Sequence, residues 1–171
     1  PIIDENMTDS NVGARRNRNI RDNIFVINAI LNNVRKRQIK GVDITTYDAE
    51  KCFDKLWAKE CFNDIFENGF NNDKLPLLYN ENINAKIAIK TSSGTTKPIF
   101  MSDIIMQGTV WGSLFCTSTM DTLGKQVYKM PEMCYDYKGV LVPPLGMVDD
   151  IITVTNVAQT RSMNKMINTF I

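Results

Sequence analysis

The chain has 171 residues, of which 43 % are hydrophobic and 23 % are charged. These proportions are typical of a globular protein and exclude a disordered or fibrous chain. Twenty basic residues nearly balance nineteen acidic ones, so no strong overall field selects a partner. The sequence contains no histidine. This excludes Ser-His and Cys-His nucleophiles and leaves carboxylates, Lys, Tyr, Cys or an oxygen-bound metal as the available chemistry.

The cysteines are scattered and form no closely spaced pair: Cys52, Cys61, Cys116 and Cys134. Without such pairs, and without histidine, the pattern argues against a zinc site. It is typical of buried free thiols in a reducing compartment. No signal peptide is recognisable, and Gln, Gly, Ser and Thr interrupt the longest uncharged run, 104–120. We therefore expect an intracellular protein without a membrane span.

A cationic segment lies near the start of the chain. Residues 15–40 include eight basic residues and a single acid, Asp22. The segment begins as a loop and continues as a predicted amphipathic helix that ends before Gly41. Its predicted apolar face consists of Ile20, Ile24, Ile27, Leu31 and Val34. Taken alone, the segment indicates a solvated surface or a salt-dependent contact with phosphates.

The rest of the chain alternates between predicted strands and helices. β-Branched and aromatic residues predict a strand over 42–47, with Asp48 at its exit. Apolar spacing predicts helices over about 49–68, with Phe53, Leu56, Trp57, Cys61, Ile65 and Phe66 facing inward, and over 73–82, 108–128 and 163–170. A hairpin is predicted over 85–100, and short strands over 135–137, 145–148 and 151–155. This order predicts an α+β fold whose small antiparallel sheet has helices on one side.

Two adjacent acids, Asp149 and Asp150, separate the last two predicted strands and are expected to form the turn between them. Adjacent carboxylates repel each other unless a cation neutralises them. A hard divalent cation does this with oxygen ligands alone, and Asp48 is the best placed third acid. Two Mg²⁺ ions about 3.5–4 Å apart would then support phosphoryl transfer. Each acid also has a structural interpretation, because acids are common in turns and at helix N-caps.

Four segments, taken in order, resemble the motifs of one family. The run 47–54 resembles motif A of reverse transcriptases, in which an Asp is followed five residues later by an aromatic residue. Gln107-Gly108 resembles the start of motif B, and Met147-Val148-Asp149-Asp150 resembles motif C. The run 13–24 resembles the fingers motif of the non-LTR (LINE-type) retrotransposon reverse transcriptases. The resemblance covers about residues 11–155, which is most of the chain.

The resemblance to this family implies a catalytic centre. Asp48, Asp149 and Asp150 would be the catalytic residues and would hold two Mg²⁺ ions, or Mn²⁺, together with the backbone carbonyl of Ala49. Phe53 would lie beneath the sugar of the incoming nucleotide and would exclude a 2′-hydroxyl.

The resemblance also implies the remaining nucleotide-binding residues. Gln107 and Gly108 would line the nucleotide and template pocket. Arg15 and Arg18 are candidates for binding the triphosphate, because a guanidinium suits phosphate oxygens. The nearby Arg16 and Arg21 leave this choice open.

The implied architecture is a reverse-transcriptase palm, a small antiparallel sheet packed on helices, with part of the fingers and no thumb. Residues 1–42 would belong to the fingers, 43–56 and 108–171 to the palm, and 57–107 to a fingers/palm insertion. The implied partners are an RNA template, a DNA primer, a dNTP and the remainder of a parent polyprotein, because the chain ends within an apolar helix. The family resemblance further implies the nucleus.

We therefore expect an RNA-directed DNA polymerase that transfers nucleotides from dNTP to a primer 3′-hydroxyl on an RNA template. One alternative is a catalytically degenerate retrotransposon remnant that only binds nucleic acid through residues 15–40. A second alternative is a two-metal nuclease built on carboxylates. The aromatic Phe53, five residues after Asp48, argues against the nuclease.

Overall fold

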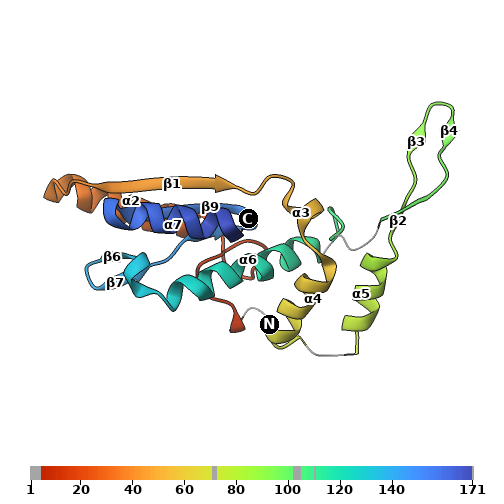
Figure 1. The fold of residues 1–171 in the computed structure, drawn as a ribbon, viewed down its shortest axis with the longest axis horizontal. Coiled ribbons are helices and arrows are strands. Elements are labelled where there is room, and N and C mark those ends of the chain that lie inside the picture. Colours follow the sequence, from red (N-terminus) through yellow and green to blue (C-terminus); the bar gives the residue numbers. More distant parts are fainter. Residues whose placement is uncertain (1–4, 71–72, 102–104, 110, 171) are drawn as a thin grey trace.

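The computed structural model describes residues 5–70, 73–101, 105–109 and 111–170 (Figure 1). Its main sheet has three antiparallel strands in the order β1-β9-β8, namely Val42–Asp48, Asp150–Asn156 and Leu145–Met147. β1 pairs with β9 along its whole length, from Val42 opposite Asn156 to Asp48 opposite Asp150. The mixed α+β fold with a small antiparallel sheet confirms the predicted fold class.

Helices pack on both faces of this sheet. On one face, α6 (Gly112–Tyr128) and α7 (Val157–Phe170) form a core that includes Ile151 of β9. On the other face, Ile30 of α2 (Ile20–Arg37) packs with Val154 of β9. Residues 151 and 154 point to opposite sides because side chains alternate along a strand. The prediction that helices cover one face of the sheet was wrong, because β9 has buried apolar side chains on both faces, Ile151 on one and Val154 on the other.

Asn19 is the N-cap of α2 and forms a capping box with Asp22. The side chains of Ile20 and Ile24 are 40 % and 49 % exposed, so the predicted apolar face is not buried over its first two turns. There the helix contacts the sheet through Asn23, whose side-chain amide donates to the Gly146 carbonyl oxygen at 2.9 Å. Burial of apolar residues begins at the next turn, with Val26, Ile27, Ile30 and Val34.

The predicted helix over 49–68 is two helices, α3 (Cys52–Lys55) and α4 (Ala58–Glu67). They are separated at Leu56, whose backbone is extended and whose side chain packs against both cores beside it. The change of direction places Trp57 and Phe66 at the surface, 65 % and 56 % exposed, where the pattern predicted burial. The buried face of α4 instead consists of Ala58, Cys61, Phe62 and Ile65.

Between α4 and α6 in the sequence, the chain forms α5 (Leu75–Ile83) and a hairpin that projects from the body of the fold (Figure 1). The hairpin pairs β2 (Lys86–Ile87) with β5 (Ile99–Phe100) and β3 (Lys90–Thr91) with β4 (Gly94–Thr95), as predicted. Within the ranges described, none of the helices has the length and apolar character needed to span a bilayer.

The C-terminal part of the chain adds two elements that the pattern did not predict. A 3-10 turn, η1 (Pro131–Met133), precedes β6 (Tyr135–Tyr137), and β6 pairs with an additional strand, β7 (Val140–Val142). The helix predicted from 108 begins at Gly112, because residues 107–109 form a turn. The C-terminal helix is confirmed as α7, with Met163 and Ile167 buried. All four cysteines are buried free thiols, as expected.

Candidate active site at the end of the β1–β9 ladder

The last register pair of the β1–β9 ladder consists of two acids. Asp48 ends β1 and lies directly opposite Asp150, the first residue of β9. Directly opposed residues of an antiparallel pair project from the same face of the sheet. Both side chains are exposed, so they remain available to a ligand. The strand pairing thus brings together two of the three predicted catalytic acids from distant parts of the sequence.

The third acid, Asp149, belongs to the turn before β9. The turn consists of Val148 and Asp149, between the paired residues Met147 and Asp150. The predicted turn over Asp149 and Asp150 is therefore displaced by one residue, because Asp150 pairs within the ladder. Val148 has a φ of 60°, as the first position of a tight hairpin turn requires. A β-branched residue in this region is strained, at a cost of about 1–3 kcal/mol.

The charges of these acids act on two buried thiols, Cys52 and Cys116. The sulfurs of Cys52 and Cys116 are 3.3 Å apart. The hydrogen bond with Cys116 lowers the pKa of the Cys52 thiol, while burial and the charges of Asp149 and Asp48 oppose this change. The same hydrogen bond, burial and the charge of Asp149 raise the pKa of Cys116. The charges of Asp48 and Asp149 thus both act on the thiol of Cys52 at the start of α3.

The donor chemistry of this site suits a hard cation, because carboxylate and carbonyl oxygens are the ligands that Mg²⁺ prefers. However, among the described residues no three His, Cys, Asp or Glu side chains are arranged as a group that would hold a metal ion. The Ala49 carbonyl oxygen accepts a hydrogen bond from the Cys52 amide at 3.1 Å. The backbone thus brings the oxygen donors together, but their side chains do not form a ready-made chelate.

The N-terminal loop closes the opposite edge of the sheet and contacts the turn. Asn11 forms a parallel bridge with Gly146, and its side chain is bonded to Val148. Asn11 was not predicted as a site residue. The only signal in the sequence is its position two residues before Gly13, since Asn often bonds to the backbone two residues on. The amide of Gly13 does donate to the Asn11 Oδ1 at 2.9 Å.

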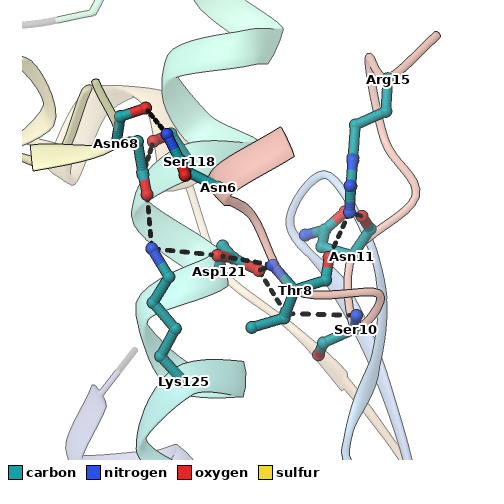
Figure 2. Close-up of polar contacts among 9 residues, drawn as sticks. All are labelled: Asn6, Thr8, Ser10, Asn11, Arg15, Asn68, Ser118, Asp121 and Lys125. Carbon is teal, nitrogen blue, oxygen red and sulfur yellow. Dashed lines mark hydrogen bonds and ion pairs between the residues drawn. The ribbon is translucent and has the colours of Figure 1, made fainter. Parts of the chain in front are cut away.

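Arg15 does not lie where a triphosphate-binding residue is expected. Its side chain is 8 % exposed, and its guanidinium donates to the carbonyl oxygens of Thr8 and Asn11 (Figure 2). A guanidinium used in this way stabilises the loop from within. Arg18, the second predicted residue, is at the surface, where it forms an ion pair with Asp9. Exposed pairs of this kind contribute only about 0–1 kcal/mol, so Asp9 holds the Arg18 side chain only weakly.

Phe53 and the Gln107-Gly108 turn approach the same end of α6. Phe53 is half-buried and packs against both cores, and a methyl group placed on Gly112 would lie 3.7 Å from its ring. Gln107 and Gly108 are exposed in the turn before α6, with φ of 79° at Gly108. Thr109 joins this turn to the helix, because its Oγ1 accepts from the Gly112 amide at 3.0 Å.

No family model matches the chain, and no curated protein matches it. The fold of the chain does resemble solved structures. Apo telomerase from Candida tropicalis, truncated from its C-terminal domain, has a TM-score of 0.61 at 16 % identity over 94 % of this chain and 32 % of that chain. Telomerase from Candida albicans, in complex with a TWJ fragment of telomeric RNA, has a TM-score of 0.68 at 14 % identity over 93 % of this chain and 29 % of that chain.

Telomerase from Candida tropicalis, in complex with a TWJ fragment of telomeric RNA, has a TM-score of 0.63 at 16 % identity. The match covers 91 % of this chain and 26 % of that chain. The chain thus spans about a third or less of the telomerase chains that it matches. At these identities the likeness concerns the fold alone. The chain has a reverse-transcriptase-like fold with palm and fingers elements.

Proposed function

We propose that this chain is the fingers–palm part of an RNA-directed DNA polymerase of the non-LTR retrotransposon type. The observation that carries the proposal is the cross-strand pair of Asp48 and Asp150 beside the turn that bears Asp149. The reverse-transcriptase-like fold supports the reaction class, a nucleotidyl transfer. Two of the similar telomerase structures were solved with an RNA fragment, which supports RNA as a partner of this chain.

Mg²⁺ would be held by the carboxylates of Asp48, Asp149 and Asp150 and by the Ala49 carbonyl. When bound in such a site, divalent ions activate an attacking hydroxyl and stabilise the leaving oxygen of a phosphoryl transfer. Asp48 and Asp150 are exposed, so their side chains can turn toward an ion without repacking of the core. The ladder contributes the fixed backbone positions from which these carboxylates reach the ligand.

The nucleotide would lie over Phe53, against the turn before α6. The ring of Phe53 is held between two cores, so it would present a rigid surface to the sugar and exclude a 2′-hydroxyl by overlap. Gln107 and Gly108, both exposed, would line the pocket. Arg18 replaces the buried Arg15 as the better candidate for the triphosphate, because its guanidinium is at the surface.

Primer extension on an RNA template with Mg²⁺ tests this function in the full-length parent chain. We expect the wild type to extend the primer and Asp149→Asn to abolish extension, while Asp73→Asn, at an exposed acid outside the site, leaves it unchanged. Equal extension by the wild type and Asp149→Asn would refute the assignment of the acids.

A catalytically degenerate remnant that only binds nucleic acid is the second candidate. One observation favours it, namely that the three acids do not form a ready chelate among the described residues. Melting with and without divalent ions separates the two candidates. Mg²⁺ or Mn²⁺ at about 100 times its Kd should stabilise a competent site by about 2.7 kcal/mol. The remnant should show no shift, and Asp149→Asn should remove the shift of a competent site.

A further inference from the structure

The turn that carries Asp149 is held by a side chain from the start of the chain. The Asn11 Nδ2 donates to the Val148 carbonyl oxygen at 2.8 Å, and the Val148 amide donates to the Asn11 Oδ1 at 3.1 Å. One carboxamide therefore binds both backbone polar groups of the same turn residue. Asn11 is 2 % exposed, so these bonds are shielded from competing water.

Val148 is the residue of the turn that most needs such support. Its positive φ is unfavourable for a β-branched side chain, and a strained conformation persists only where its surroundings enforce it. The neighbouring Gly13 leaves no room for a different arrangement, because a methyl group there would overlap the Val148 backbone and stand 2.7 Å from its Cγ2. The carboxamide of Asn11 and the close contact with Gly13 together select the backbone conformation of the turn that carries Asp149.

Asn11 is itself anchored in a buried polar network (Figure 2). The Arg15 guanidinium donates to the Asn11 carbonyl oxygen at 3.0 Å and also to the Thr8 carbonyl oxygen. The Thr8 amide donates to the carboxylate of Asp121, which is fully buried in α6, at 3.0 Å. Asp121 in turn lies 3.5 Å from the Lys125 ammonium. The turn is thereby connected through the N-terminal loop to the long helix of the palm.

We propose that Asn11 is a positioning residue for the catalytic turn: it holds Val148 in its strained conformation and so places the carboxylates of Asp149 and Asp150. This inference rests on the proposed function for its catalytic consequence, but the hold on the turn is a property of the chain alone. Asn11 acts on the acids through its hydrogen bonds to the backbone of Val148, and not through a contact with either carboxylate.

Asn11→Ala tests the proposal, with Asn23→Ala as its matched control. Asn23 is also buried, and it donates to the Gly146 carbonyl oxygen at 2.9 Å, close to the turn but not on it. Hydrogen exchange of the full chain is followed by mass spectrometry on peptides covering 145–151. We expect Asn11→Ala to speed exchange in these peptides about tenfold relative to the control, as loss of one buried hydrogen bond allows. Equal exchange in the two variants overturns the proposal.

A stability cycle covers the case in which Asn11→Ala folds poorly. Glycine adopts a positive φ without strain, so in Val148→Gly no strain is released when the contacts of Asn11 are lost. We expect Asn11→Ala to shift the urea midpoint more in the Val148→Gly background than in the wild type, where relaxation of the strained Val148 offsets part of the loss. Equal shifts in both backgrounds would show that Asn11 does not support the strained turn, and would contradict the proposal.

Steady-state kinetics separate this inference from the proposed function. If Asn11 positions the acids, Asn11→Ala should lower kcat about 10–100-fold, the range seen for residues that orient metal ligands, with little change in the KM for dNTP. Unchanged kcat in Asn11→Ala, with Asp149→Asn inactive, overturns the positioning role and leaves the polymerase function intact. An inactive wild type overturns the function, and the exchange data still decide whether Asn11 holds the turn.

Discussion

Asp48 and Asp150 stand directly opposite each other at the end of the β1–β9 ladder. Two carboxylates of like charge therefore share one face of the sheet at the point where its strands end. Directly opposed like charges are destabilising, so this pair is not explained by the stability of the sheet. The proposed binding of Mg²⁺ by these acids would account for the arrangement.

Asp150→Asn should stabilise the chain when divalent ions are removed. The substitution eliminates the repulsion with Asp48, which is worth about 0.2–1 kcal/mol. We expect a higher urea midpoint than that of the wild type in EDTA, and a smaller difference in high salt because salt screens exposed charges. With Mg²⁺ the order should reverse, because only the wild type gains binding energy. A lower midpoint of Asp150→Asn in EDTA would contradict this account.

Arg18→Gln should weaken binding of the incoming nucleotide. Loss of a charged hydrogen bond costs about 1.5–3 kcal/mol, so we expect the KM for dNTP to rise at least about tenfold while template affinity changes little. Arg161→Gln, at an exposed arginine of α7 outside the proposed site, is the control. The same KM in the two variants would remove Arg18 from the triphosphate site.

Gly13→Ala should destabilise the chain although Gly13 has an ordinary φ. The added methyl group would overlap the Val148 backbone, and overpacking of this kind costs about 1–3 kcal/mol. Ala14→Gly is a suitable control, because Ala14 is exposed and has a φ of 52°, which glycine adopts without strain. Urea unfolding should show a lower midpoint for the first variant only. A midpoint equal to that of the wild type would mean that the loop can move away from the turn.

Asp121→Ala should be among the most destabilising substitutions in the chain. The buried carboxylate accepts hydrogen bonds from the amide and hydroxyl of Thr8, and its removal leaves these half-buried donors without their acceptor. Hydrogen bonds to a charged group contribute about 1.5–3 kcal/mol each, and those from both the amide and the hydroxyl are lost. Lys125→Met removes the half-exposed partner and should cost much less. Equal costs in urea unfolding would show that the ion pair, rather than the Thr8 contact, is what Asp121 provides.

Stability should fall at high pH because of Cys61. Burial raises the pKa of this thiol from 9.0 to about 11. Between these values the unfolded chain releases the proton and the folded chain keeps it, so the free energy of unfolding decreases as the pH rises. The decrease amounts to about 2–3 kcal/mol. Urea midpoints from pH 8 to pH 11 should fall less steeply in Cys61→Ala; parallel curves would exclude this cause.

Much of the local structure around the proposed site could be predicted because its signals are local. The β-branched run before Asp48 is a strand, as its composition indicates. The apolar residues on either side of Asp149 and Asp150 form the hairpin strands β8 and β9. The order of these segments was sufficient for the fold, which the telomerase structures share.

The rest depends on contacts between distant residues, which the sequence alone does not reveal. The turn lies one residue earlier than predicted, because Asn11 and Gly13 support a positive φ that Val148 would not adopt by preference. Arg15 is typical of a phosphate ligand by residue type, yet its loop folds so that Thr8 and Asn11 take its hydrogen bonds. The helix break at Leu56 likewise reflects the two cores between which this side chain packs.

The ladder between β1 and β9 also determines when the sheet can form. About 100 residues separate Asp48 from its partner Asp150, and ribosomes add about 5–20 residues per second. About 5–20 s therefore pass between the synthesis of β1 and that of its partner β9. During this time the backbone of β1 is an open edge that other chains can join. Asp48 and Asp150 come together only after Asp150 has been made, and a chain that ends before it cannot assemble this pair.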